Sequence, residues 1–139
     1  MVCEETTVGA GVRVVSGRTS ERHCPVCRTP LLVAVMDDKY RIEMCEQCRG
    51  ILMPRNTFVE TIIGRRRAAA PPPVIPPHTD PRELHRRVRC PGCSAQMMTD
   101  WYYGPGNIVL DTCPACDLAW LDVGELQRVV DAPGPDRPA

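Results

Sequence analysis

Aromatic side chains are scarce in this sequence of 139 residues, which has two tryptophans, three tyrosines and one phenylalanine but 15 prolines. A composition so poor in aromatic residues and so rich in proline argues against one large hydrophobic core. No apolar run approaches the roughly 18 residues of a membrane span. The opening stretch "MVCEETTVGAGVRVV" is acidic at its start and has no apolar segment typical of an export signal. We therefore expect a cytoplasmic chain that is stabilised by something other than a large core or disulfides.

Cysteine, in contrast, is plentiful and regularly spaced. Eight of the nine cysteines form four C-x-x-C pairs, and Cys3 stands alone. Seventeen residues separate Cys27 from Cys45, and 19 separate Cys93 from Cys113. Both spacings fit the pattern of a four-cysteine zinc site. The sequence therefore predicts two structural zinc sites per chain, whose ligands are Cys24, Cys27, Cys45 and Cys48 in the first and Cys90, Cys93, Cys113 and Cys116 in the second.

Other uses of paired cysteines fit the sequence less well. A thioredoxin-like redox pair lies in a βαβ setting, and iron–sulfur ligation gathers several cysteines closely; neither pattern occurs here. A single iron ion in four thiolates has the same ligand set as zinc, so an iron-loaded redox or thiol-sensing protein stays an alternative. Four sulfur ligands leave no position for a catalytic water on the metal. We therefore expect that the protein is not an enzyme, and no small-molecule substrate is evident.

The chain contains two copies of one unit, which align when Cys24 is laid on Cys90. Each copy has a cysteine pair, two strand-like runs joined by a turn, a second pair and a helix. The turns are "DDK" in the first copy and "GPGN" (104–107) in the second. This order predicts a small metal-stabilised α+β fold: two tandem zinc ribbons, each a β-hairpin with two C-x-x-C knuckles and a short C-terminal helix.

The two helices are predicted from their caps and their apolar residues. Asp122 and Glu125 have the spacing of a capping box. In the first copy Pro54 stands at the position of Asp122, so the helix is predicted to start at Thr57 with Glu60 as its partner. The predicted buried sides consist of Phe58, Ile62 and Ile63 in the first copy and of Leu126, Val129 and Val130 in the second.

The stretch "CPACDLAWLDVGEL" resembles the second knuckle of the transcription-factor-IIB-type zinc-ribbon family. The matching residues are Cys113, Pro114, Cys116, Trp120, Leu121, Asp122, Glu125 and Leu126. The first copy matches less well, since it keeps Gly50 but has Leu52 and Pro54 in place of tryptophan and aspartate. The resemblance implies that each copy is a zinc ribbon and that the protein is a small binding module linked to transcription. Family knuckles often have glycine after the second cysteine, where this chain has Arg28, Arg49, Ser94 and Asp117.

The predicted organisation follows from the repeat and from composition. We expect a disordered N-terminal tail (1–20), ribbon 1 with its helix (21–63), an Arg/Pro-rich linker (64–89), ribbon 2 with its helix (90–131) and a disordered tail (132–139). Crossed ligand sets that share pairs between the copies are the alternative to two sequential sites. Because each copy carries a complete set of four cysteines, we expect sequential sites.

Charge and a group of aromatic residues at the tip of the second predicted hairpin suggest how the ribbons act. Residues 64–89 carry a net charge of +5 and residues 90–139 a net charge of −5. We expect a protein-interaction adaptor whose candidate surface combines the hairpin tip with the basic linker. The alternative is a nucleic-acid-binding factor in transcription or RNA handling, in which the arginines contact phosphate. The candidate partner-binding residues are Trp101, Tyr102, Tyr103, Arg65, Arg66, Arg67, Arg86 and Arg87.

Overall fold

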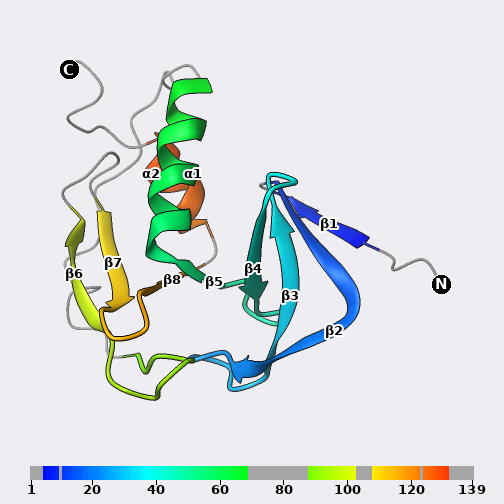
Figure 1. Ribbon diagram of the computed structural model, residues 1–139, viewed down its shortest axis with the longest axis vertical. Helices are drawn as coiled ribbons and strands as arrows, with labels where there is room; N and C mark the ends of the chain where they lie inside the picture. Colours follow the sequence, from blue (N-terminus) through cyan, green and yellow to red (C-terminus); the bar gives the residue numbers. More distant parts are fainter. Residues whose placement is uncertain (1–4, 10, 69–87, 103–107, 123, 132–139) are drawn as a thin grey trace.

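The computed structural model describes residues 5–9, 11–68, 88–102, 108–122 and 124–131. Their strands form one antiparallel sheet in the order β1-β2-β3-β4-β5-β8-β7-β6 (Figure 1). The elements are β1 (Glu5–Gly9), β2 (Val12–His23), β3 (Pro30–Met36), β4 (Tyr40–Met44), β5 (Ile51–Pro54), α1 (Arg55–Ala68), β6 (Met98–Tyr102), β7 (Ile108–Cys113), β8 (Leu118–Leu121) and α2 (Glu125–Asp131). The predicted metal-stabilised α+β fold is thus confirmed.

The predicted hairpin of each copy is present. In the first copy, β3 and β4 pair over their facing residues from Leu32↔Met44 to Met36↔Tyr40. Asp37 and Asp38 in the connecting turn have φ values of 55° and 54°, as expected for the turn that matches the right-handed twist of a hairpin. In the second copy, β6 pairs with β7. The turn predicted at 104–107 lies outside the described residues.

The N-terminal residues extend the sheet. The predicted disordered tail at 1–20 is wrong where β1 and β2 form, because β2 pairs with β3 and supplies core side chains. Val12 faces Met36 and is 1% exposed, and Val14 packs against the same cluster. Without β2, the backbone groups on the outer edge of β3 would lack partners, which makes this extension favourable.

The two copies join through β5 and β8, the short strands that follow the last knuckle of each copy. Their facing residues are Ile51↔Leu121, Leu52↔Trp120 and Met53↔Ala119. Leu52 and Trp120 each lie four positions after the last cysteine of their copy. The pairing therefore has the register of a two-fold contact, in which equivalent residues exchange roles about an axis between Leu52 and Trp120.

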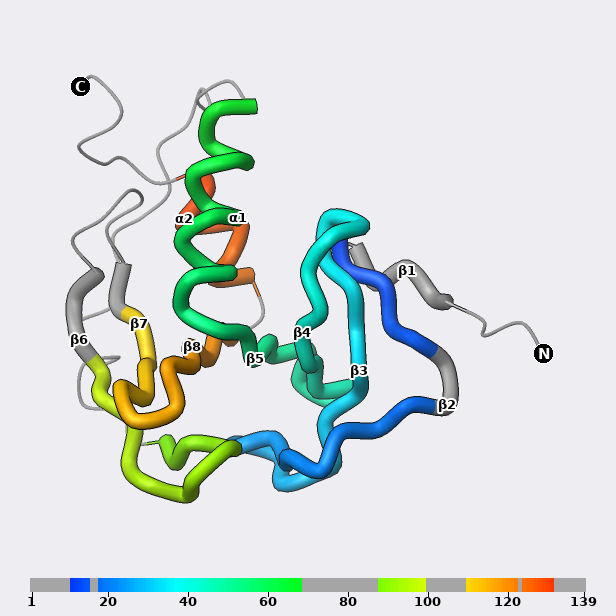
Figure 2. The backbone as a smooth tube through the Cα atoms, viewed as in Figure 1, coloured from blue at the N-terminus to red at the C-terminus, as the bar shows by residue number. Residues whose placement is uncertain are grey.

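Residues of β5 and β8 alternate between the two faces of the sheet. Ile51, Met53, Ala119 and Leu121 contribute to a core cluster with apolar residues of α1 and α2. Leu52, Leu118 and Trp120 contribute to a second cluster with cysteines of both copies. The backbone trace shows both helices on one side of these central strands and the knuckle loops on the other (Figure 2). The junction thus separates a helix side from a metal side.

Helix α1 begins at Arg55, two positions before the predicted start at Thr57. The Arg55 N–H donates to the Asp117 carbonyl oxygen at 2.9 Å, so the second copy supplies a partner at this end. Phe58 and Ile62 are buried as predicted, whereas Ile63 is only half-buried. The helix continues to Ala68, past the predicted boundary at residue 63. Residues 69–87 of the predicted linker lie outside the described residues, as does the predicted tail 132–139. The predicted linker end at residue 89 is wrong, because Val88 is buried in a core cluster and Arg89 forms a β-bridge with Gln96.

Helix α2 begins at Glu125, and the predicted link between Asp122 and Glu125 is present, although Gly124 between them has a φ of 82° and its carbonyl oxygen accepts the first helical hydrogen bond, from the Arg128 N–H. The Glu125 Oε2 atom accepts a hydrogen bond from the Asp122 N–H at 3.3 Å, as the glutamate of a capping box does. Leu126, Val129 and Val130 are buried as predicted. Among the described residues, no helix combines the length and hydropathy needed to cross a membrane.

Candidate metal centres

Each copy brings its four predicted cysteines to one point. The Sγ atoms of Cys24, Cys27, Cys45 and Cys48 lie within 4.8 Å of one another, and so do those of Cys90, Cys93, Cys113 and Cys116. The Cys24–Cys48 and Cys93–Cys113 Sγ distances are both 3.6 Å. A tetrahedron of sulfur atoms at about 2.3 Å from zinc has edges of about 3.8 Å, so the spacing fits the ion. Each set of four ligands comes from one copy, the first set from the first copy and the second set from the second. This confirms two sequential sites.

The knuckle backbone holds its shape without glycine. Arg28, Arg49, Ser94 and Asp117 have φ values of 62°, 62°, 65° and 57°, in the left-handed region that glycine adopts most easily. The turn is closed by backbone hydrogen bonds such as Arg28 N–H to Cys24 O at 2.9 Å and Arg49 N–H to Cys45 O at 2.9 Å. The departure from the family pattern noted in the sequence therefore leaves the knuckle geometry intact.

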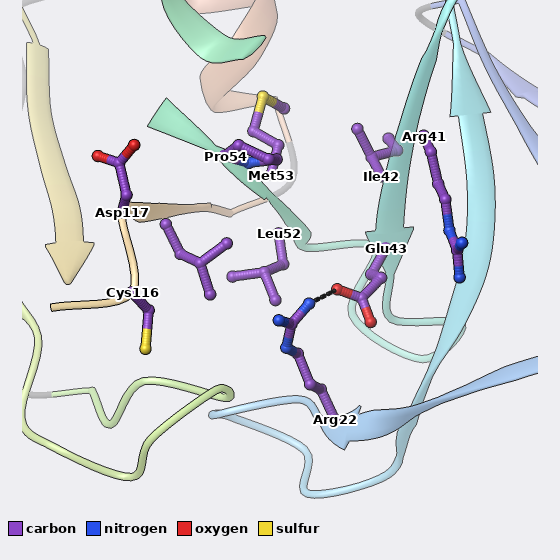
Figure 3. A pocket seen from close by; sticks show the side chains of 10 residues that line it. Arg22, Arg41, Ile42, Glu43, Leu52, Met53, Pro54, Cys116 and Asp117 are labelled. Atoms are coloured by element: carbon purple, nitrogen blue, oxygen red, sulfur yellow. Dashed lines mark hydrogen bonds and ion pairs between the residues drawn. The ribbon is translucent and has the colours of Figure 1, made fainter. Parts of the chain in front are cut away.

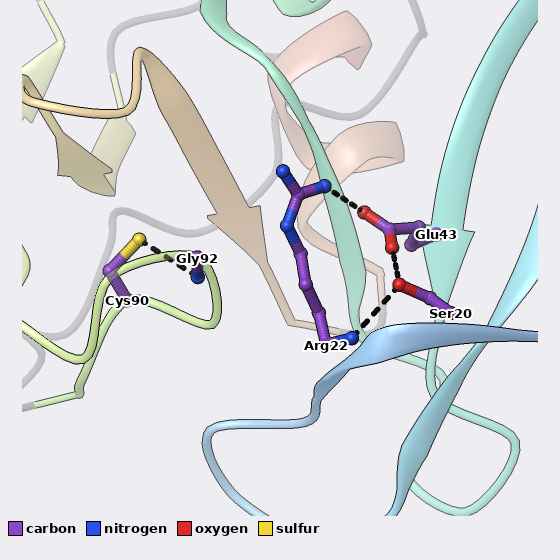
Figure 4. Close-up of polar contacts among 5 residues, drawn as sticks. All are labelled: Ser20, Arg22, Glu43, Cys90 and Gly92. Atoms are coloured by element: carbon purple, nitrogen blue, oxygen red, sulfur yellow. Dashed lines mark hydrogen bonds and ion pairs between the residues drawn. The ribbon is translucent and has the colours of Figure 1, made fainter.

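Main-chain N–H groups point at the sulfur atoms. Cys24 Sγ accepts from the Cys27 N–H at 3.2 Å, Cys45 Sγ from the Cys48 N–H at 3.4 Å, and Cys90 Sγ from the Gly92 N–H at 3.3 Å (the last drawn in Figure 4). Such donors stabilise a thiolate more than a neutral thiol. The knuckles thus direct backbone donors at three of the ligand sulfur atoms, although burial still raises the pKa of the Cys90 thiol.

The thiols of one centre do not share one pKa. Burial raises the pKa of Cys45, but hydrogen bonds from the Cys48 N–H and the Thr29 hydroxyl outweigh it and lower the pKa to about 6. Burial, with the neighbouring thiols of the cage, raises the pKa of Cys48 to about 12. The second centre also has one thiol with a lowered pKa and one with a raised pKa. A hydrogen bond from the Cys116 N–H lowers the pKa of Cys113 to about 7. The side chain of Cys93 is the main cause that raises the pKa of Cys116 to about 12. Four crowded thiolates therefore need a cation to ionise together.

A comparison with family models agrees with this geometry. A model described as "Transcription factor zinc-finger", a zinc ribbon of the transcription-factor-IIB type, matches residues 23–62 and 89–132, more than half of the chain. The chain belongs to this family. Searches of curated proteins and of solved structures found no match. As a member of the family with two complete cysteine sets, the chain holds two zinc ions, each bound by four thiolates.

The two centres of this zinc-ribbon protein share one apolar cluster. Cys24 and Cys45 of the first centre and Cys90 and Cys113 of the second lie in the same buried cluster as Trp120. Trp120 was predicted as core, and its side chain is completely buried. Its Nε1 atom donates to Asp122 Oδ1 at 3.3 Å. The ring of the second copy therefore helps to cover metal centres of both copies.

Gly50 is the residue of the first copy that makes room for this ring. A Cβ atom at Gly50 would lie 2.2 Å from Trp120 Cζ2 and 2.7 Å from Trp120 Cη2. No side chain can therefore stand at position 50 while the ring keeps its place. The sequence did not reveal this contact, although the contrast between a glycine in one copy and Leu118 at the same position in the other was a signal for it.

The predicted arginine cluster divides among three environments. Arg65 binds the Asp37 carboxylate with two hydrogen bonds of 2.7 and 3.0 Å. Arg66 is 5% exposed and donates to the carbonyl oxygens of Val129 and Val130 at 2.7 and 3.1 Å, at the C-terminal end of α2. Arg67 is exposed. Two of these three arginines thus hold α1 to its neighbours.

The remaining predicted partner-binding residues are only partly described. The backbone of Trp101 and Tyr102 lies in β6, the strand at one edge of the sheet. Tyr103, Arg86 and Arg87 lie outside the described residues. Their role in partner binding stays a prediction.

Proposed function

We propose that this chain is a non-catalytic adaptor, in which two zinc ions fix the shape of a surface that binds another protein. The observation that carries the proposal is the closure of both centres: each has four sulfur ligands from its own copy. A tetrahedral ion with four protein ligands has no position left for a substrate or an attacking water. In this arrangement zinc supplies folding energy, which suits a binding module rather than a reaction centre.

The state of the arginines favours a protein partner over nucleic acid. Nucleic-acid binding through the basic cluster requires guanidinium groups that can reach phosphate. Arg66 is buried against α2, and Arg65 is paired with Asp37. Of the three consecutive arginines near the end of α1, Arg65–Arg67, only Arg67 is exposed; the other arginine of the helix, Arg55, is exposed at its opposite end. Transcription-related binding of nucleic acid is therefore the second candidate, and its support is the family description together with the +5 charge of residues 64–89.

Binding assays on the zinc-loaded chain separate the two candidates. We expect the chain, used as bait with and without zinc, to capture a protein in a zinc-dependent and nuclease-resistant manner. The purified pair should then form a complex of defined stoichiometry in isothermal titration calorimetry. In parallel, fluorescence anisotropy with labelled single-stranded and double-stranded oligonucleotides is measured between about 50 and about 200 mM salt. Tight oligonucleotide binding that weakens steeply with salt, together with capture that nuclease abolishes, would refute the adaptor proposal.

A further inference from the structure

A pocket of about 360 Å³ lies where the two copies meet (Figure 3). One wall comes from Arg22 at the end of β2 and from Arg41 and Glu43 in β4. The opposite wall comes from the last knuckle of the second copy, which includes Asp117, and β5 runs between the two walls. The volume is within the range of ligand pockets. Because both copies line it, the pocket exists only when β5 and β8 are paired.

The pocket occupies a place where the strand ladder stops. β4 pairs with β3 along its whole length, from Tyr40 to Met44, but with β5 only at Glu43 and Met44. If the ladder continued, Ile42 would face Met53, and both residues line the pocket. The next position would place Pro54, which has no N–H, opposite Arg41, and the chain turns into α1 immediately afterwards.

Beside the pocket the β4 edge therefore has no second strand in the part of the chain that the structure describes, and its exposed residue is Arg41, since Ile42 is 2% exposed. Among the described residues, Tyr40–Ile42 have a strand partner on the β3 side only. An extended peptide can add to such an edge through main-chain hydrogen bonds, with specificity from the side chains around it. Leu52 and Leu118 line the pocket below this edge, and with 1% and 5% of their surfaces exposed they offer a small apolar floor.

The arginine wall is suited to a carboxylate. Glu43 accepts hydrogen bonds from Arg22 Nη1 at 2.7 Å and from the Ser20 hydroxyl, while the Arg22 N–H donates to Ser20 Oγ at 3.0 Å (Figure 4). This network holds the Arg22 guanidinium, a group with five N–H donors, in one orientation, and in Figure 3 it extends from β2 toward the pocket. Arg41 is exposed, and no ion pair of its side chain occurs within the described part of the chain. The Glu43 charge is already matched by Arg22, so Arg41 leaves this wall with an unmatched positive charge.

We infer that this junction pocket binds an extended peptide segment of the partner protein, with an acidic side chain beside an apolar one. The peptide passes the unpaired edge of β4 at Arg41, its carboxylate binds Arg22 and Arg41, and its apolar side chain reaches the small floor formed by Leu52 and Leu118. Asp117 on the opposite wall accepts N–H groups of the peptide. The inference rests on the proposed adaptor function and names the chemistry of the partner.

Selection from a random dodecapeptide display library on the zinc-loaded full chain tests this inference. Counter-selection uses the Arg41→Glu variant, which reverses a charge that is exposed and makes no described ion pair. We expect enriched peptides to carry aspartate or glutamate next to leucine, isoleucine, valine or phenylalanine. By fluorescence polarisation, such a peptide should bind Arg41→Glu at least about tenfold more weakly than the wild type, since hydrogen bonds to charged groups are lost.

The matched control is Arg18→Glu, which makes the same charge change at an exposed position of β2 that does not line the pocket. We expect Arg18→Glu to bind the peptide as the wild type does, and circular dichroism and zinc content should show both variants folded. Amide chemical shifts on peptide addition should move at Tyr40–Glu43, Leu52 and Leu118. Failure to enrich such peptides, equal losses in the two variants, or shifts confined to other strands would overturn the inference.

A separate measurement distinguishes failure of the pocket from failure of the adaptor function. The protein partner captured by the wild type is titrated with Arg41→Glu. If its affinity is unchanged, the adaptor function stands and the pocket is not the binding site. If neither protein nor peptide binds the wild-type chain, both proposals are wrong.

Discussion

The contact between Gly50 and Trp120 makes a specific prediction about Gly50→Ala. The added methyl group would lie 2.2 Å from Trp120 Cζ2, and the ring is completely buried and cannot move into solvent. Inserting a methyl group into a packed core costs about 1–3 kcal/mol. The gain from restricting the unfolded chain, about 0.4–1 kcal/mol, offsets only part of this. We expect Gly50→Ala to lower the free energy of unfolding by about 1–2 kcal/mol, measured by urea denaturation at fixed free zinc with circular dichroism.

Two further variants test whether Trp120 is the cause. Gly64 lies in α1 with no atom within 4 Å of its would-be Cβ, so Gly64→Ala should stabilise the chain by about 0.5–1 kcal/mol. Trp120→Leu removes the ring, so Gly50→Ala should cost less in that background than in the wild type. The loss in the free energy of unfolding of the double variant should therefore be about 1 kcal/mol smaller than the sum of the losses of the two single variants. Strict additivity, or equal effects at Gly50 and Gly64, would refute the reasoning.

Three further predictions concern the helices, the junction and the metal. Arg66→Met should lower the free energy of unfolding by about 1.5–3 kcal/mol and speed amide hydrogen exchange in α2, because it removes two hydrogen bonds to buried carbonyl oxygens. The control Arg67→Met, at the exposed neighbouring position, should change both quantities little. A chain cleaved at Pro73 should give two fragments that each bind one zinc ion and copurify through β5 and β8; fragments that separate on gel filtration would argue against this junction. Elemental mass spectrometry of protein purified without added metal should find two zinc ions per chain, and chelation should unfold it; iron, or folded protein after chelation, would contradict structural zinc.

The sequence predicted the metal centres well because their chemistry is local. A C-x-x-C knuckle is a short turn, and a hairpin brings two such turns together whatever surrounds them. The hydrogen bond between Asp122 and Glu125 before α2 was predictable for the same reason, since the two residues are only three positions apart. The start of α1 was not, because the partner of the Arg55 N–H is Asp117 in the other copy.

The junction between the copies depends on contacts between residues far apart in the sequence, which no local pattern specifies. β5 and β8 are four residues long and read as apolar runs with no alternation, because both of their faces are buried. The N-terminal strands were missed for a related reason: Val12 and Val14 alternate, but only the edge of β3 gives them a place to pair. The open β4 edge and its arginine wall likewise follow from where Pro54 ends the ladder.

The unequal sizes of Gly50 and Trp120 determine which ribbons can pair through these strands. Because the β5–β8 register is two-fold, a pair of identical ribbons could in principle meet in the same way. Two copies of ribbon 2 would press each Trp120 ring against Leu118, where the existing pair offers a glycine. Two copies of ribbon 1 would put Leu52 in the place of Trp120, with a void beside Gly50 where the ring now lies. The contact surfaces of the two halves are therefore complementary to each other and not to themselves, so neither half can be replaced by a second copy of the other.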